Sequence, residues 1–262
     1  MNGMLKTRQL IFLAALTLAW AGNITADDVP TTRMVAPPAD SLSPVAHSAS
    51  LDTGRSVLNK EISVFRFEGT GPEKVIIVGG IHGNEPQSVV FAEALVDSLN
   101  TLEPTTMAKT LIVIPLLNPD GFELKTRKNA RGIDLNRNFP ALDFSVGYPK
   151  SKYYGGDKAG SEPETRFMLD LLKREKPDLL IMLHTPYNLV NSDGDSLGLG
   201  PRLAETLGLK YLAEMAYSTP GAAGSYFGRE GRLPVLTVEF PARDDVWKRF
   251  GVKFLRFLLA SE

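Results

Sequence analysis

The chain has no cysteine and only 3 histidines among its 262 residues, and these scarcities limit the chemistry open to it. Without cysteine there can be no disulfide, no thiolate metal site and no thiol nucleophile. The formal net charge is only -1, so the charge gives no reason to expect nucleic acid as a partner. Any metal site must therefore be built from histidine and carboxylate side chains.

The N-terminus has the pattern of an export signal. Lys6 and Arg8 precede an apolar run from Leu10 to Ala21, which closes with an A-x-A pattern. Because a membrane span needs about 20 apolar residues, the run predicts a cleaved signal peptide over residues 1–21, with an uncleaved anchor as the alternative. We therefore expect an exported protein, in the periplasm, with no stable membrane span after cleavage.

Composition divides the remaining chain into a leader and one domain. Residues 22–59 are rich in Ala, Ser, Thr, Pro and Asp and lack a sustained apolar period, which predicts a flexible linker. His47 lies in this linker, where no neighbour could complete a site. Residues 60–262 are expected to form a single domain, since the chain's 43% hydrophobic content supports one sizeable core.

Apolar runs rich in strand-forming residues alternate with helix-like segments in this domain. Strands are expected within residues 61–69, 74–79, 110–117, 178–183 and 235–240, and helices over residues 85–99 and 246–259. Several of these strands are wholly apolar, which is typical of strands buried on both faces. The alternation predicts an α/β fold, with a mixed, mainly parallel sheet and helices on both faces.

A further helix is expected from Ser161 to Glu175. Ser161 has the position of an N-cap, Pro163 would lie in the first turn, and Glu164 would complete a capping box. This interpretation explains Ser161 and Glu164 through local structure, and it leaves Glu162 without an assigned role.

Candidate metal ligands lie beside the ends of two apolar strands. His82 and Glu85 follow the run VIIVGG, and His184 ends the run DLLIML. The carboxyl ends of strands are the edge where α/β sheets bind ligands. Two histidines and one glutamate also leave a coordination position for water, as catalytic zinc requires. Each histidine alone could be a buried structural residue, but the set predicts one Zn²⁺ per chain.

Glu239 ends another apolar strand, in the run LPVLTVEFP. Burying an unpaired carboxylate is costly, so Glu239 must have a partner or a function. Beside a zinc-activated water it could serve as general base and then pass the proton to the leaving amine. A structural ion pair with an arginine such as Arg243 is the alternative.

A basic block, NPDGFELKTRKNARGIDLNRNFP, runs from Asn118 to Pro140. Amide hydrolysis develops an oxyanion, and a free carboxylate is recognised well by a guanidinium fork. Arg127 and Arg137 could take these two tasks. A solvated basic loop is the alternative, and it fits Lys125 and Lys128 better.

Several motifs, in this order, resemble those of the zinc carboxypeptidase family of metallopeptidases: HGNEP, NPDG, DLNRNFP, SEPET and a glutamate ending a late strand. The resemblance is closer to the bacterial murein peptide amidase branch. That branch shares the R-x-N-A-x-G-x-D-L-N-R-N-F-P form and a late T-P-G…G-S-aromatic stretch, here Thr219 to Gly221 and Gly224 to Tyr226. Single motifs are weakly specific, but the ordered set over about 180 residues is strongly so.

The resemblance implies a mixed, mainly eight-stranded sheet and a role for each matching position. His82, Glu85 and His184 would bind zinc; Glu239 would act as base and acid; Arg127, or Arg131 in its place, would stabilise the oxyanion; Asn136 and Arg137 would hold the free carboxylate of the released residue. Tyr226 is a candidate wall of the pocket. The implied substrate is a peptide, cut between γ-D-glutamate and diaminopimelate in murein stem peptides.

Two other functions remain open at this stage. An aspartoacylase or succinylglutamate desuccinylase type of N-acyl amino acid amidohydrolase also uses an HGNE-like motif, although NPDG and SEPET favour the peptidase. A catalytically inactive binding protein on the same fold is the other, and the complete set of candidate ligands and base argues against it.

Overall fold

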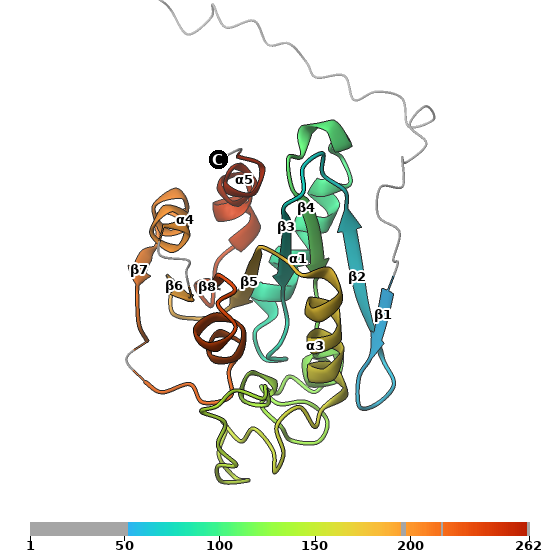
Figure 1. Ribbon diagram of the computed structural model, residues 1–262, viewed down its shortest axis with the longest axis vertical. Helices are drawn as coiled ribbons and strands as arrows, with labels where there is room; N and C mark the ends of the chain where they lie inside the picture. Colours follow the sequence, from blue (N-terminus) through green and yellow to red (C-terminus); the bar gives the residue numbers. More distant parts are fainter. Residues whose placement is uncertain (1–51, 195–197, 216, 261–262) are drawn as a thin grey trace, which may run out of the picture. The chain divides into compact units, whose positions relative to one another are not determined.

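The computed structural model describes residues 52–194, 198–215 and 217–260 (Figure 1). The predicted signal peptide, residues 1–21, and His47 lie outside these ranges. The described residues form an eight-stranded sheet in the order β1-β2-β4-β3-β5-β8-β6-β7. Its strands are β1 (Asp52–Arg55), β2 (Glu61–Phe67), β3 (Lys74–Val78), β4 (Thr110–Ile114), β5 (Leu179–His184), β6 (Leu189–Asp193), β7 (Lys210–Leu212) and β8 (Val235–Glu239).

The sheet is mixed, and its centre is parallel. Strands β4, β3, β5 and β8 run in the same direction, whereas β2 and β6 pair antiparallel to the outer members of this group. The carboxyl ends of β3, β5 and β8 therefore meet at one edge, as the sequence predicted. In Figure 1 the long green-to-yellow segment between β4 and α3 gathers at one end of the sheet.

Helices pack on both faces of the sheet. Helices α1 (Pro86–Leu99), α4 (Leu199–Leu207) and α5 (Val246–Leu259) contribute to one buried core, while α3 (Pro163–Glu175) and the π-helical segment η3 (Gly224–Glu230) contribute to the other. Short helices α2 (Pro119–Glu123), η1 (Pro104–Thr106) and η2 (Leu135–Arg137) lie in the connections. Among the described residues, no helix is long and apolar enough to cross a membrane.

Alternation in β2 divides its side chains between the two cores. Phe65 and Phe67 pack with the core that contains α1 and α5, whereas Ile62 and Val64 pack with the other core. Successive side chains of a strand point to opposite faces, so one short strand contributes to both layers.

The folded part begins earlier than the sequence suggested. Strand β1 lies within the predicted linker of residues 22–59, and it pairs antiparallel with β2 to form a hairpin at the edge of the sheet. The polar composition of this stretch concealed the strand, because an edge strand needs few apolar residues.

The predicted capping box at Ser161 is wrong. The N-cap of α3 is Glu162, and its side chain makes no capping hydrogen bond. The Ser161 hydroxyl instead donates to Glu162 Oε1 at 2.8 Å. Glu164 is fully buried and accepts hydrogen bonds from Val57 N at 3.1 Å and Asn129 Nδ2 at 3.2 Å. These distant partners replace the expected capping box because they supply hydrogen bonds to the Glu164 carboxylate, which is buried away from water.

Asp120 and Glu164 together form what we call the hairpin anchor. Ser56 Oγ donates to Asp120 Oδ1 and Leu58 N donates to Asp120 Oδ2, both at 2.9 Å. These bonds, with that from Val57 N to Glu164, tie the turn between β1 and β2 to the rest of the domain. Asp120 of the NPDG motif and Glu164 of the SEPET motif thus hold the hairpin turn in place.

Candidate metal centre

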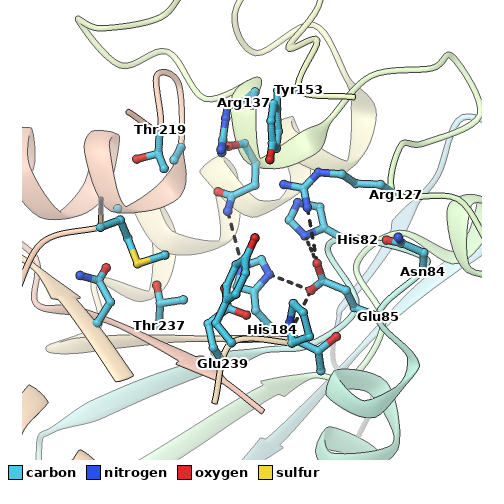
Figure 2. A pocket seen from close by; sticks show the side chains of 18 of the residues that line it. His82, Asn84, Glu85, Arg127, Arg137, Tyr153, His184, Thr219, Thr237 and Glu239 are labelled. Atoms are coloured by element: carbon cyan, nitrogen blue, oxygen red, sulfur yellow. Dashed lines mark hydrogen bonds and ion pairs between the residues drawn. The ribbon is translucent and has the colours of Figure 1, made fainter. Parts of the chain in front are cut away.

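Three buried side chains converge at the carboxyl edge of the sheet. His82 follows β3, Glu85 is the N-cap of α1, and His184 is the last residue of β5. His82 Nδ1 lies 2.7 Å from Glu85 Oε1, and His184 Nδ1 lies 2.9 Å from Glu85 Oε2. One ligand atom from each residue can be chosen so that all lie within 4.8 Å of one another. Figure 2 shows both imidazole rings beside the Glu85 carboxylate.

Close backbone packing positions the His82 loop. A Cβ on Gly83 would lie 1.9 Å from the carbonyl carbon of Gly121 in α2, so no other residue fits between His82 and Asn84 without a backbone shift. Asn118 supports the same contact, since its Nδ2 donates to Ile81 O at 3.3 Å. The HGNEP and NPDG motifs are therefore neighbours in space.

Asp134 lies behind His82 and places a second carboxylate beside the His82 ring. Its Oδ1 is 3.1 Å from His82 Nε2, the ring nitrogen that faces away from Glu85. Burial favours neutral His82, but the carboxylates of Glu85 and Asp134 outweigh burial and raise the pKa of His82. Burial likewise opposes ionisation of Glu85, yet the two histidines hold the pKa of Glu85 well below its usual range. A carboxylate behind a ligating histidine is a common support for metal sites.

Glu239 lies next to this cluster. It ends β8 directly opposite His184 in the parallel register, and it is 6% exposed. Its Oε2 atom is buried without a hydrogen-bond partner, and burial raises the pKa of Glu239. No ion pair joins Glu239 to Arg243 in the described part of the chain, so the structural alternative drawn from the sequence gains no support.

Arg127, and not Arg131, borders the cluster. Arg127 Nε donates to Asp134 Oδ2 at 2.8 Å, and its Nη1 lies 3.5 Å from Glu85 Oε1. The side chain of Arg131 is 54% exposed and pairs with Glu162 at 3.5 Å. The geometry thus favours Arg127 for a charge that develops at the cluster.

Asn136 and Arg137 lie on η2, and Figure 2 shows Arg137 across the cavity from Glu239. Asn136 Nδ2 is 3.4 Å from His184 Nε2. Arg137 is 5% exposed, and burial lowers its pKa. The ring of Tyr153 lies 5.3 Å from the guanidinium carbon of Arg137 and 5.3 Å from that of Arg127. Tyr153 therefore makes a cation–π contact with each of the two arginines.

One cavity of about 640 Å³ is lined by the three cluster residues and by Arg127, Asn136, Arg137, Tyr153 and Glu239, but not by Tyr226. Tyr226 packs against Phe227 and lines a different cavity between α3 and η3. Tyr187 and Tyr217 line the main cavity instead, and burial raises the pKa of Tyr217 to about 12. Sequence reasoning missed Asp134, Tyr153 and Tyr217. Of these, Asp134 carried a signal, because it stands inside the DLNRN motif.

Comparison with known proteins agrees with this geometry. The sequence pattern of the zinc carboxypeptidase family matches residues 46–227. The chain belongs to the zinc carboxypeptidase family. It is 34% identical to murein peptide amidase A of Escherichia coli (strain K12) over 199 residues, which cover 72% of this chain and 79% of the relative. It is 30% identical to murein peptide amidase A of Vibrio campbellii, over 72% of this chain and 77% of the relative.

Solved structures support the same assignment. The murein-tripeptide amidase of Escherichia coli O157 superimposes with a TM-score of 0.67 at 30% identity, covering 80% of this chain and 91% of that one. An aspartoacylase family protein from Mesorhizobium loti shares the fold, with a TM-score of 0.57 at 23% identity, covering 76% of this chain and 62% of that one. The chain is a metallopeptidase-type hydrolase, and the sequence alternative of an inactive binding protein loses its basis.

Proposed function

We propose that the protein is a zinc-dependent amidase that cleaves the bond between γ-D-glutamate and diaminopimelate in murein stem peptides. The observation that carries the chemistry is the buried, unpartnered Oε2 of Glu239 beside the cluster of His82, Glu85 and His184. The substrate is supported by similarity to murein peptide amidase A over most of both chains.

The donor set of the cluster fits zinc. His82 and His184 both direct Nδ1 toward the Glu85 carboxylate, and all three residues are buried. Two imidazoles and one carboxylate, with a position left for water, are a common ligand set of catalytic zinc. When bound there, zinc would supply the Lewis acidity that activates water and polarises the scissile carbonyl.

Glu239 is suited to move the proton. The pKa of Glu239 is raised toward neutral pH. A general base with such a pKa can accept a proton from water and later release it. Oε2 has no partner to compete for that proton. Glu239 would therefore deprotonate the attacking water and then protonate the leaving nitrogen.

The arginines opposite Glu239 are suited to bind negative charge. Arg127 lies 3.5 Å from Glu85, and it can stabilise the oxyanion that forms at the scissile carbonyl. Asn136 and Arg137 can hold the free carboxylate of the released residue, since a guanidinium fork matches a carboxylate. This division of tasks gives each of the two arginines of the cavity a separate role.

The test is hydrolysis of L-Ala-γ-D-Glu-meso-diaminopimelate by the purified, zinc-loaded protein, followed by mass spectrometry. We expect release of free diaminopimelate by the wild type, its loss after treatment with a chelator, and its recovery when zinc is returned. Glu93→Gln, on the exposed side of α1, is the matched control for a change at Glu239. Absence of hydrolysis by the zinc-loaded wild type would contradict the proposal.

Metal binding has its own readout, independent of activity. We expect about one zinc per chain by elemental analysis, and a stoichiometry well below one in His82→Ala and His184→Ala. The histidine variants should remain folded, as judged by circular dichroism. Zinc retained at the wild-type level in both variants would exclude this site.

N-acyl amino acid hydrolysis is the second candidate, and the comparisons give it only a shared fold. N-acetylaspartate and N-succinylglutamate should be assayed beside the murein tripeptide. We expect their turnover to be at least a hundredfold slower. Faster turnover of either one would reverse the choice.

Export remains an inference from residues 1–21. We infer that these residues direct the protein to the periplasm and are removed there. A fusion of residues 1–30 to alkaline phosphatase should be active in a Gram-negative host, and N-terminal sequencing should find the mature chain starting at Gly22. An inactive fusion would contradict export, and a retained N-terminus would favour the anchor.

A further inference from the structure

Three cations contact one aromatic ring at the edge of the cavity. The guanidinium carbons of Arg127 and Arg137 each lie 5.3 Å from the centre of the Tyr153 ring, and Lys152 Nζ lies 4.7 Å from it. All four residues line the cavity. Figure 2 shows Tyr153 beside Arg137, on the side of the cavity opposite Glu239. Because two points cannot be farther apart than the sum of their distances to a third, Lys152 Nζ is at most about 10 Å from either guanidinium carbon.

The charge of Lys152 has no acidic partner in the described part of the chain. Arg127 pairs with Asp134 at 2.8 Å, and Arg137 is left for the terminal carboxylate of the substrate. Lys152 Nζ contacts the Tyr153 ring and forms no ion pair with any described carboxylate. Like charges at these distances repel one another, so the cavity would favour a ligand that brings a second anionic group to Lys152.

Lys152 lies where the cavity opens to solvent, which we call its mouth. The Lys152 side chain is exposed and Tyr153 is 38% exposed, whereas the three cluster residues and Glu239 are buried. The residue that the enzyme releases ends the substrate, so it fills the enclosed part of the cavity, and the acyl part leads out through the mouth. Lys152 is therefore placed to meet the acyl side of the scissile bond.

The separation of Arg127 and Lys152 fits an acyl residue that carries its own carboxylate. In γ-linked glutamate, four bonds separate the scissile carbonyl carbon from the carbon of the α-carboxylate. At about 1.5 Å per bond, an extended chain of this length spans about 5 Å. A hydrogen bond of about 3 Å at each end brings the reach to about 11 Å. One glutamyl residue can therefore bridge the two cations, which are at most about 10 Å apart.

We propose that Lys152 binds the α-carboxylate of the γ-linked glutamate, and so selects acyl groups that carry a carboxylate at this distance from the scissile carbonyl. This inference rests on the proposed function, because it assigns a partner to the acyl half of the same substrate. Contact with the Tyr153 ring holds the lysine ammonium at the mouth before the substrate arrives, which reduces the entropy lost on binding. Lys152 binds the substrate in this assignment and does not touch the reacting atoms.

The experiment compares two peptides that differ in one group: L-Ala-γ-D-Glu-meso-diaminopimelate, and its analogue in which the glutamate α-carboxylate is a carboxamide. The carboxamide keeps nearly the same shape and removes the charge. Wild type, K152M, K152R and the control K150M, which removes an exposed charge outside the cavity, are assayed with both peptides.

We expect the wild type to prefer the carboxylate peptide about fivefold in kcat/KM, through a lower KM, since an ion pair at the mouth is partly exposed to water. The preference should shrink as the salt concentration is raised, because salt screens such a pair. K152M should cleave both peptides equally well. K152R keeps the charge, and it should keep the preference, as should K150M.

The carboxamide peptide reports on folding and chemistry in each variant, because it retains diaminopimelate and the scissile bond. An equal loss on both peptides in K152M would place the contact of Lys152 on the released residue or on the neighbouring arginines, and would overturn the proposal. So would a preference that K152M retains, or a wild type without any preference. These results would leave the proposed function intact, since the wild type would still release diaminopimelate. If it releases none from either peptide, the proposed function fails and this inference falls with it.

Discussion

Buried carboxylates occur in two regions of this protein, and they differ in how their oxygens are satisfied. In the hairpin anchor, each carboxylate oxygen of Asp120 and Glu164 accepts a hydrogen bond from Ser56, Val57, Leu58 or Asn129. At the metal cluster, Glu239 Oε2 is buried and accepts none. Both regions are built from motifs that mark the zinc carboxypeptidase family.

The hydrogen bonds distinguish carboxylates that support the fold from a carboxylate that can take part in chemistry. An unpaired buried polar atom costs free energy, and among these carboxylates Glu239 Oε2 is the oxygen that bears this cost. Both oxygens of each anchor carboxylate already accept a hydrogen bond from the fold. Motif membership alone does not distinguish these cases, whereas the hydrogen bonds do.

Glu239→Gln should have the largest effect on activity. We expect kcat to fall by about 10²- to 10⁴-fold, because an amide cannot accept the proton of water. Thermal stability should be unchanged or higher, since the change removes a buried charge. Steady-state kinetics and a melting curve measure both. A kcat within tenfold of wild type would contradict the assignment of Glu239 as the general base.

Arg127→Ala and Arg131→Ala should differ sharply. Loss of Arg127 should lower kcat by about 10²- to 10³-fold, the range seen when one oxyanion donor is removed. Arg131 is largely exposed, and its loss should change kcat less than threefold. Part of the Arg127 effect could come from leaving Asp134 without its partner, so the melting temperature of each variant is measured as well. Equal effects of the two substitutions would contradict the assignment of the oxyanion role to Arg127 over Arg131.

Asp120→Ala should destabilise the fold without affecting chemistry. It leaves Ser56 Oγ and Leu58 N without their acceptor, at a cost of about 2–4 kcal/mol in the free energy of unfolding. Urea denaturation measures this cost. Activity per folded molecule should stay within twofold, and a selective loss of kcat in a fully folded sample would contradict a purely structural role.

The pH dependence of stability should have opposite signs at Glu164 and Asp134. Burial raises the pKa of Glu164, so its contribution is fully present below its unfolded pKa of about 4.3 and is lost as pH rises through the native value. Burial opposes ionisation of Asp134, but His82 and Arg127 lower its pKa. Its contribution is therefore present above about pH 3.9 and is lost as pH falls through the native value.

Urea unfolding of the metal-free protein between pH 3 and pH 7 tests these signs. Asp134→Asn should flatten the loss of stability on the acid side, and Glu164→Gln should flatten the change above about pH 4. Parallel profiles for wild type and both variants would show that neither group is linked to folding.

Tyr226→Phe should have the smallest effect. Tyr226 lines the cavity between α3 and η3 and not the one that holds the cluster. We expect kcat/KM to stay within twofold of wild type on the murein tripeptide. A tenfold rise in KM would restore Tyr226 as the pocket wall that the sequence suggested.

Much of the fold follows from apolar periodicity. The runs that became β3, β4, β5 and β8 are largely apolar and almost wholly buried, and such runs are recognisable from sequence alone. The polar edge strand β1 and the three-residue strand β7 carry no such signal. These two strands form because a neighbouring strand offers backbone hydrogen bonds. The position of that neighbour is set by the tertiary structure.

The sequence by itself determined the residues that can do chemistry. With no cysteine and two histidines in the folded part, His82 and His184 were the available nitrogen ligands, and strand ends predicted where they meet. The tertiary structure decided the rest. It brought Arg127 to the cluster and left Arg131 exposed. It also gave each oxygen of Glu164 a hydrogen-bond donor and left Glu239 Oε2 without one. These outcomes depend on distances between segments remote in the chain, and spacing along a sequence does not contain them.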